Sequence, residues 1–281
     1  MMRSTSITVF ACHSAACRPP KSGGTGGSLP AGAAGSGPRM PISSRKMVEV
    51  MKATALGEVY ADLYWEDMDK RLVQDTMVAL RAAGMDRTKP RTVSAAEFER
   101  LAAESPDDVV ARSAPPQNHR DLLESDTIRL IPASVAYGKG IYFAGGRDAA
   151  RHVLENYQVR NNTVLRAIVD RSSLADYDFI MDVISAAKMM AEGGQSEKPK
   201  KVLDAANVLV DVFKESGVKL DTSVWGPGSS AMSQPSLVAP LLGYKGYVVK
   251  NPNAAVMSGD AVDYVVILDR SALTVPDTLP E

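Results

Sequence analysis

The chain has 281 residues, of which 45% are hydrophobic and 23% are charged, as in ordinary globular proteins. Its 32 Lys and Arg residues against 33 Asp and Glu residues give a net charge of -1, so nucleic acid is not expected as a partner. No run of about 18 apolar residues occurs, so no membrane-spanning helix is expected.

Both cysteines, Cys12 and Cys17, lie near the N-terminus, which excludes a disulfide framework for the rest of the chain. A structural zinc site takes four ligands, and His119 and His152 stand far from these cysteines in the sequence. The apolar stretch at residues 7–11 is shorter than the core of a secretion signal, which has about 7–15 residues. We therefore expect neither a metal site nor a secretion signal.

Two segments precede the main folded part. Residues 1–44 are expected to form a flexible tail, because glycine, proline and serine dominate residues 19–44. Such a tail either tethers the folded part to a larger assembly or has no role. Residues 45–90 are expected to form a helical element, since apolar residues recur at helical intervals over residues 46–83. This pattern predicts two helices or one bent helix, ended by Gly84.

Residues 91–281 are expected to form one mixed domain of helices and strands. Ser94 and Glu97 make a capping-box pattern, which predicts that a helix begins there. Further helices are predicted at residues 148–157, 175–191 and 200–215, strands at 108–112, 127–137, 163–169, 246–249 and 263–268, and a loop at 115–119. The last strand is continuously apolar, as expected of a strand buried on both faces. The predicted fold class is therefore α+β, without a regular βαβ alternation.

Residues 137–146, which read YGKGIYFAGG, are the most informative segment. They lack the spacing of a phosphate-binding P-loop and of a dinucleotide-binding fingerprint. They resemble the second strand of the ADP-ribosyltransferase fold, where a GxGIYFA stretch precedes a helix that opens with small residues. The resemblance implies that Gly138 and Gly140 let the chain approach the nicotinamide end of NAD. It also implies that Tyr142 lies in the pocket wall and that His152 or Tyr157 stacks on the nicotinamide.

Residues 109–113, which read VVARS, resemble the first-strand signature of the arginine-type branch of that family, with Ala111 and Ser113 in place of the usual tyrosine and glycine. The resemblance makes Arg112 the anchor of the NAD phosphates and ribose, a role that suits the two-pronged guanidinium. His119 is the competing residue, read as the histidine of the poly-ADP-ribosyltransferase branch. Arg112 is favoured because its β-branched neighbours suit a strand, whereas residues 115–119 read as a loop.

Residues 259–273 resemble the late strand on which the family carries its catalytic glutamate, and the matching residue is Asp263. Its carboxylate would stabilise the positive charge that develops on the nicotinamide ribose as the glycosidic bond breaks. Aspartate is one methylene shorter than glutamate, which favours weak or lost catalysis as an alternative. Ala261 stands two residues upstream, so the Glu-x-Glu pattern of arginine-modifying enzymes is missing, and Asp260 is an uncertain substitute.

Residues 17–28 and 268–273 resemble the ADP-ribosyltransferase or MuF-like minor head proteins of tailed phages of actinobacteria, which implies a place in the virion or the host cytoplasm and capsid or portal proteins as partners. The family resemblance covers roughly residues 93–275 and makes NAD the expected substrate. The first hypothesis is a mono-ADP-ribosyltransferase that modifies a host protein. The alternatives are a structural capsid protein that keeps the fold without the reaction, and an NAD glycohydrolase that uses water as the acceptor.

Overall fold

The computed structural model describes residues 42–53, 65–130, 137–146, 148–157, 161–216, 235–250 and 262–278. These residues form a mixed α/β structure with one eight-stranded sheet. The helices are α1 (Ser44–Ala53), α2 (Trp65–Ala83), α3 (Ala95–Glu104), α4 (Pro116–Glu124), α5 (Ala149–Tyr157), α6 (Tyr177–Ala191), α7 (Lys200–Ser216) and α8 (Pro235–Leu241). The strands are β1 (Arg91–Val93), β2 (Val109–Ala114), β3 (Ile141–Gly145), β4 (Thr163–Val169), β5 (Leu174–Asp176), β6 (Gly246–Val249), β7 (Asp263–Ile267) and β8 (Leu273–Pro276).

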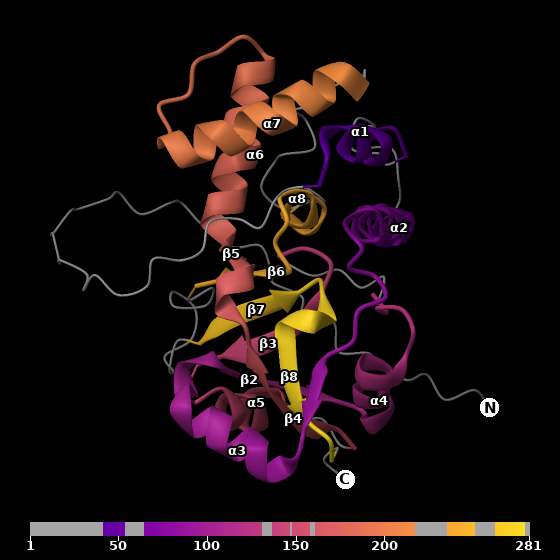
Figure 1. Ribbon diagram of the computed structural model, residues 1–281, viewed down its shortest axis with the longest axis vertical. Helices are drawn as coiled ribbons and strands as arrows, with labels where there is room; N and C mark the ends of the chain where they lie inside the picture. The colour runs from indigo at the N-terminus through magenta and orange to yellow at the C-terminus, as the bar shows by residue number, and fades with distance from the viewer. Residues whose placement is uncertain are drawn as a thin grey trace, which may run out of the picture.

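The sheet is curled, with strand order β1-β8-β4-β2-β3-β7-β6-β5 (Figure 1). Its interior pairs are antiparallel, and the two outermost pairs, β1 with β8 and β5 with β6, are parallel. The strands do not pair in simple sequence order, because β2 lies between β4 and β3. The mixed class of helices and strands confirms the coarse expectation from the sequence.

The register defines two faces of the sheet. Val110 pairs with Gly145 and Ala111 pairs with Ala144, so Arg112 points to the same face as Val110 and Gly145. We call this the Arg112 face. The opposite face carries Ala111 and Ala144, and we call it the Tyr142 face because Tyr142 has the same parity as Ala144 on β3.

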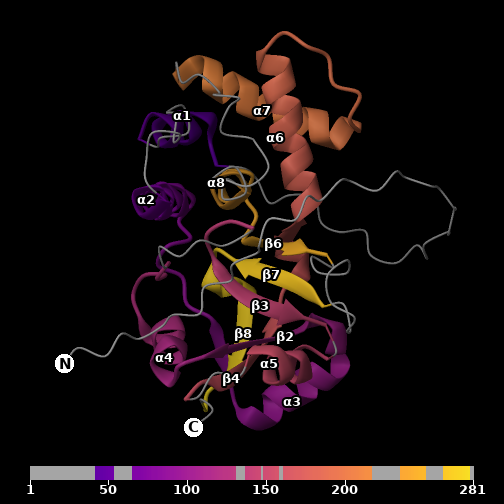
Figure 2. The same cartoon turned by 180° about the vertical axis from the view of Figure 1, so that it is seen from behind.

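Different helices cover the two faces. On the Tyr142 face, Ala111 and Ala144 pack against α5, and Val109 packs against Phe98 of α3. On the Arg112 face, α4 contributes Leu122 to the main core. Figures 1 and 2 show α3, α4 and α5 arranged around the same half of the sheet.

The remaining helices, α1, α2, α6, α7 and α8, gather at the other end of the molecule, at the top of Figure 1. Here α1 packs on α7 and α2 packs on α8, so the N-terminal helices contact helices from residues 200–241. Met47 of α1, Leu80 of α2 and Leu209 of α7 belong to one core with the strand residues Phe143 and Val265. The helical layer is therefore assembled from two distant parts of the sequence.

Several sequence predictions are confirmed. The Ser94 side chain accepts a hydrogen bond from the Glu97 backbone N–H at 3.3 Å, as a capping residue does. Gly84 ends α2 with a φ of 69°, in the left-handed region that favours glycine. The two N-terminal helices, the strands β4 and β6, and the helices α5 and α7 lie where the hydrophobic patterns placed them. In β7, Val265, Val266 and Ile267 are fully buried, as a strand covered on both faces requires.

Other predictions were wrong. Residues 115–119 are not a loop, because α4 begins at Pro116, whose missing N–H and fixed φ suit the first helical position. No strand occurs at residues 127–130, Tyr137 lies in a turn, and residues 131–136 of that expected strand lie outside the described residues. The helix expected from residue 175 begins at Tyr177, because residues up to Asp176 form the short strand β5 and the Asp176 side chain caps the helix.

Gly246 is required by the close approach of β6 to β7. A β-carbon at this position would lie 2.2 Å from the Val266 carbonyl oxygen, which is backbone and cannot move aside cheaply. We expect Gly246→Ala to lower the free energy of unfolding by about 3 kcal/mol and the melting temperature by roughly 6–12 °C. Gly84→Ala is the control, because nothing lies within 4 Å and the φ of 69° alone costs about 1 kcal/mol. Equal melting temperatures for the two variants would contradict this packing.

Candidate functional site

Arg112, the expected phosphate anchor, lies on β2 opposite Leu165 of β4 and is partly exposed. Its guanidinium carbon stands 5.7 Å from the centre of the Phe143 ring. Within the described part of the chain it forms no hydrogen bond and no ion pair. Burial lowers the pKa of its guanidinium to about 10, which measures how poorly the charge is solvated. A cation left in this state is a common feature of anion-binding sites.

His119 lies beside Arg112, although the sequence offered the two as competitors. It is completely buried on α4, and its Nε2 lies 3.0 Å from the Thr163 carbonyl oxygen. A carbonyl only accepts hydrogen bonds, so Nε2 carries the proton and Nδ1 holds a free lone pair. Nδ1 of His119 and Oγ1 of Thr163 are both buried without a hydrogen-bond partner. Burial lowers the pKa of His119, and the charge of Arg112 adds to that effect.

Asp263, the expected charge stabiliser, is the first residue of β7 and pairs with Gly145. Because Gly145 also pairs with Val110, Asp263 lies on the Arg112 face. Standard strand spacing and rise place the α-carbons of Asp263 and Arg112 about 12 Å apart. Phe143 and Val265 lie between them on this face and are buried in the main core.

Two cations that the sequence analysis missed lie near Asp263. The Arg171 side chain reaches over Gly145, where a β-carbon would stand 3.5 Å from its Nη2. Its guanidinium donates to the Asp107 carbonyl at 2.7 Å and lies 3.2 Å from the Asp108 carboxylate. The sequence could have indicated Arg171 only by its position, two residues after the end of β4.

Lys250 is the second cation. It follows β6 directly and, by continuation of the register, lies opposite Asp263. It forms an ion pair with Asp176, and that hydrogen bond raises the pKa of its ammonium group, with a smaller contribution from the charge of Asp263. Asp263 therefore lies close to two cations, each of which is paired with another carboxylate.

Tyr142 lies on the opposite face. Its hydroxyl donates a hydrogen bond of 2.6 Å to the Gly138 carbonyl, and burial raises its pKa. It belongs to a group of tyrosines in which the rings of Tyr137 and Tyr177 meet edge to face at 5.6 Å. The structure does not bring Tyr142 together with Arg112, because the sheet separates the two side chains.

Backbone conformation and close packing explain why glycine stands at positions 138 and 140 of the loop. Gly138 has a φ of 104°, which only glycine adopts readily. A β-carbon on Gly140 would stand 2.3 Å from the Val266 Cγ1 atom. The loop is also fixed by a 3.1 Å hydrogen bond from the Lys139 backbone N–H to the Ser236 hydroxyl of α8. These contacts explain both glycines through the packing of the chain on itself.

The residues expected to stack on the nicotinamide lie away from Arg112. His152 is a half-buried residue of α5, the helix that covers the Tyr142 face. Tyr157 is the last residue of α5, and its side chain lies outside the described part of the structure. Asp260 lies outside the described residues as well. Of the expected site residues, Arg112 and Asp263 share one face, and Tyr142 and His152 belong to the other.

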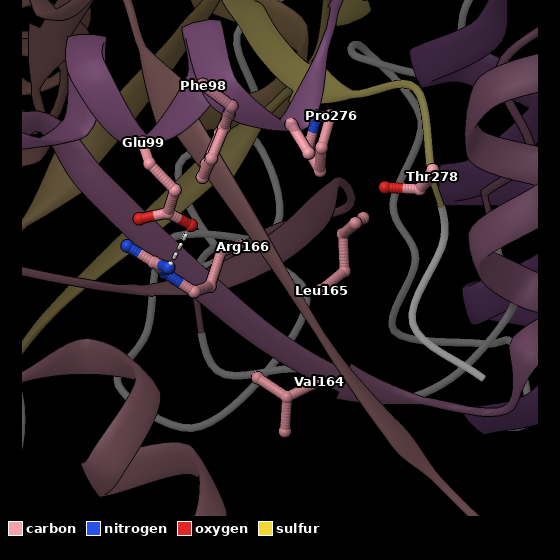
Figure 3. Close-up of a pocket in the computed structure, with 8 residues that line it drawn as sticks. Phe98, Glu99, Val164, Leu165, Arg166, Pro276 and Thr278 are labelled. Atoms are coloured by element: carbon pink, nitrogen blue, oxygen red, sulfur yellow. Dashed lines mark hydrogen bonds and ion pairs between the residues drawn. The ribbon is translucent and has the colours of Figure 1, made fainter.

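A cavity of about 250 Å³ lies beside β4, between α3 and β8 (Figure 3). Its wall combines Phe98 of α3, Val164 of β4 and Pro276 of β8. Glu99 and Arg166 face each other at its rim, with a hydrogen bond of 2.8 Å. Because Glu99 already neutralises Arg166, this cavity offers an apolar surface and no uncompensated charge.

Among the described residues, no group of three or more His, Cys, Asp or Glu side chains could hold a metal ion. In the same residues, no helix combines the length and the apolar character that crossing a membrane requires. Comparisons with protein-family models, curated proteins and solved structures give no match. The function must therefore be argued from the site itself.

His119 should make the stability of the folded protein depend on pH. Its pKa is lowered from 6.5 by folding, so the unfolded chain binds a proton first as the pH falls. We therefore expect the free energy of unfolding to fall as the pH drops below 6.5, by up to about 1.4 kcal/mol per pH unit. Urea unfolding of the wild type and of His119→Gln across this range measures the effect. Parallel stability curves for the two proteins would contradict the assignment.

Proposed function

We propose that the protein is an NAD-dependent mono-ADP-ribosyltransferase and that its curled sheet with flanking helices is a member of that fold. In this proposal the reaction takes place on the Arg112 face. Residue by residue, the assignment comes from the sequence resemblance at residues 109–113, 137–146 and 259–273.

The observation that carries the proposal is that Arg112 and Asp263 lie on one face of the sheet. They come from strands separated by about 150 residues of sequence, and the buried side chains of Phe143 and Val265 lie between them. Among the described residues Arg112 has no ion-pair partner, and Asp263 lies near Lys250 and Arg171, which are paired with Asp176 and Asp108. Such a pair suits a substrate with a negative pyrophosphate at one end and a developing positive charge at the other.

The chemistry assigned to these groups is simple. The Arg112 guanidinium holds pyrophosphate oxygens through paired N–H donors. The bond between the ribose C1′ atom and the nicotinamide nitrogen breaks, and nicotinamide leaves with the electron pair. The Asp263 carboxylate stabilises the resulting positive charge on the ribose. A nucleophile of the acceptor protein then bonds to C1′ and releases its proton to solvent.

Lys250 and Arg171 act as positioning residues for Asp263 in this proposal. The ion pair with Asp176 holds Lys250 at the end of β6, and the contacts of Arg171 with Asp107 and Asp108 hold it over Gly145. Contact of the nicotinamide with Tyr142, or stacking on His152, would need the substrate to reach the other face. The proposal therefore rests on Arg112 and Asp263. The pocket-wall roles of Tyr142 and His152, and the close approach of Gly138 and Gly140 to NAD, are separate expectations.

A second candidate function is a capsid protein without the reaction, located in the virion. Two observations favour it: position 263 holds aspartate where the family has glutamate, and the glycine loop packs on its own chain. In the first proposal the acceptor is a host protein, capsid or portal proteins are the further partners, and the protein works in the virion or the host cytoplasm.

Incubation with NAD labelled on its adenylate group and a host-cell lysate tests these functions. Label on a protein band is the expected result and identifies the acceptor. Free labelled ADP-ribose with no labelled band would indicate hydrolysis. Neither product, after purified protein has been shown to be folded, would overturn the enzymatic proposal and favour the capsid protein.

A further inference from the structure

Two buried polar atoms without a hydrogen-bond partner lie near the partly exposed Arg112 guanidinium. They are Nδ1 of His119 and Oγ1 of Thr163. Arg112 and Thr163 are diagonal neighbours on adjacent strands, because Arg112 pairs with Leu165 and Ala114 pairs with Thr163. His119 reaches the same place from α4 through its bond to the Thr163 carbonyl. Buried polar groups normally have partners, so this cluster calls for a ligand.

The protonation state of His119 limits what that ligand can be. Its Nε2 proton is used by the Thr163 carbonyl, and its Nδ1 lone pair would repel a negatively charged oxygen. Arg112, beside it, attracts an anion. Arg112 therefore attracts an anion that the Nδ1 lone pair repels. Both residues can bind the same anion only if Nδ1 gains a proton when the anion binds.

We infer that Arg112 and His119 form a phosphate-binding site in which binding of the anion transfers one proton from solvent to Nδ1 of His119. Burial is the main reason that the pKa of His119 is lowered, and the charge of Arg112 adds to that effect. The bound anion cancels this charge and gives a proton on Nδ1 an acceptor. The new N–H is a charge-assisted donor in a region with few hydrogen-bond partners. A buried histidine thus changes from a base to a donor only when the site is occupied.

The charges around His119 support this coupling. On β2, Arg112 is the charged group that acts on it, and β4 contributes the neutral Thr163 carbonyl. On α4 itself, Arg120 is exposed, and Asp121 is engaged by Arg129 at 3.1 Å. At the C-terminal end of α4, Arg270 donates to the Leu122 carbonyl at 3.1 Å and is fully buried. No carboxylate of the described residues is paired with Arg112, so an external anion has the strongest effect on it.

The inference rests on the proposed function only in taking an NAD pyrophosphate as the natural ligand. Sulfate is the better probe, because it stays fully ionised where histidine titrates and brings no proton of its own. Isothermal titration calorimetry of sulfate into the full chain, in two buffers of different ionisation enthalpy, measures proton uptake directly. We expect an uptake that approaches one proton per sulfate, and an affinity that falls by up to tenfold per pH unit between about pH 5.5 and 7.5.

Two variants test whether His119 is the residue that takes up the proton. His119→Gln should abolish both the uptake and the pH dependence, whereas Asn118→Ala, exposed on the same helix, should leave both unchanged. If His119→Gln does not fold, the uptake of the wild type decides alone. Sulfate binding without proton uptake, or no sulfate binding, would overturn the inference. Nicotinamide release is measured separately, so an active enzyme without proton uptake and an inactive protein with it are distinguishable outcomes.

Discussion

Replacing Asp263 with asparagine should slow nicotinamide release from NAD by about 10²–10³-fold and leave the affinity for NAD within a few-fold of the wild type. The carboxylate opposes a charge that exists only as the glycosidic bond breaks, so its loss raises the barrier more than it weakens binding. Steady-state rates of nicotinamide release, with binding measured by calorimetry, separate the two quantities.

Asp204→Asn is the matched control for Asp263→Asn. Asp204 is an exposed carboxylate on α7 whose partner is Lys200, so its loss should change neither rate nor affinity. Undiminished nicotinamide release by Asp263→Asn would remove Asp263 from the mechanism.

Arg112→Met should have the second large effect, and in two opposite directions. NAD affinity should fall by more than tenfold, because the guanidinium is the expected pyrophosphate ligand. The free protein should become more stable by about 1–2 kcal/mol, because a poorly solvated cation without an acidic partner is replaced by an apolar side chain. Thermal unfolding and NAD titration of the same preparation measure both.

Arg166→Met provides the comparison, since Arg166 lies on the neighbouring strand, on the other face, and is paired with Glu99. It should leave NAD affinity unchanged and give no gain in stability. Loss of stability in Arg112→Met, together with unchanged NAD affinity, would mean that Arg112 is a structural residue.

Most of the larger elements could be predicted from the sequence, because their signals are local. The apolar run of β7, the capping box at Ser94 and the helical stripe of α7 each depend on neighbours within a few residues. The strands β1, β5 and β8 have three or four residues, too few for an alternating pattern to stand out. For α4, the prolines at residues 115 and 116 suggested a loop, although proline is also common at the first helical position.

The arrangement of the candidate site could be predicted only in part. The residue types and their order along the chain pointed to Arg112 and Asp263. Which side chains share a face depends on strand register, and a shift by one residue would move Tyr142 to the Arg112 face. The sequence contains no local signal for that register. Pairing of β2 with both β3 and β4 also could not be foreseen, and neither could the approach of His119 from α4.

Hydrogen exchange of the full chain, measured with and without saturating NAD, shows where NAD binds. We expect NAD to slow exchange in α4 and at the ends of β3 and β7 that carry Gly145 and Asp263. Protection confined to α3 and β8, around the cavity of Figure 3, or no protection at any NAD concentration, would contradict this expectation.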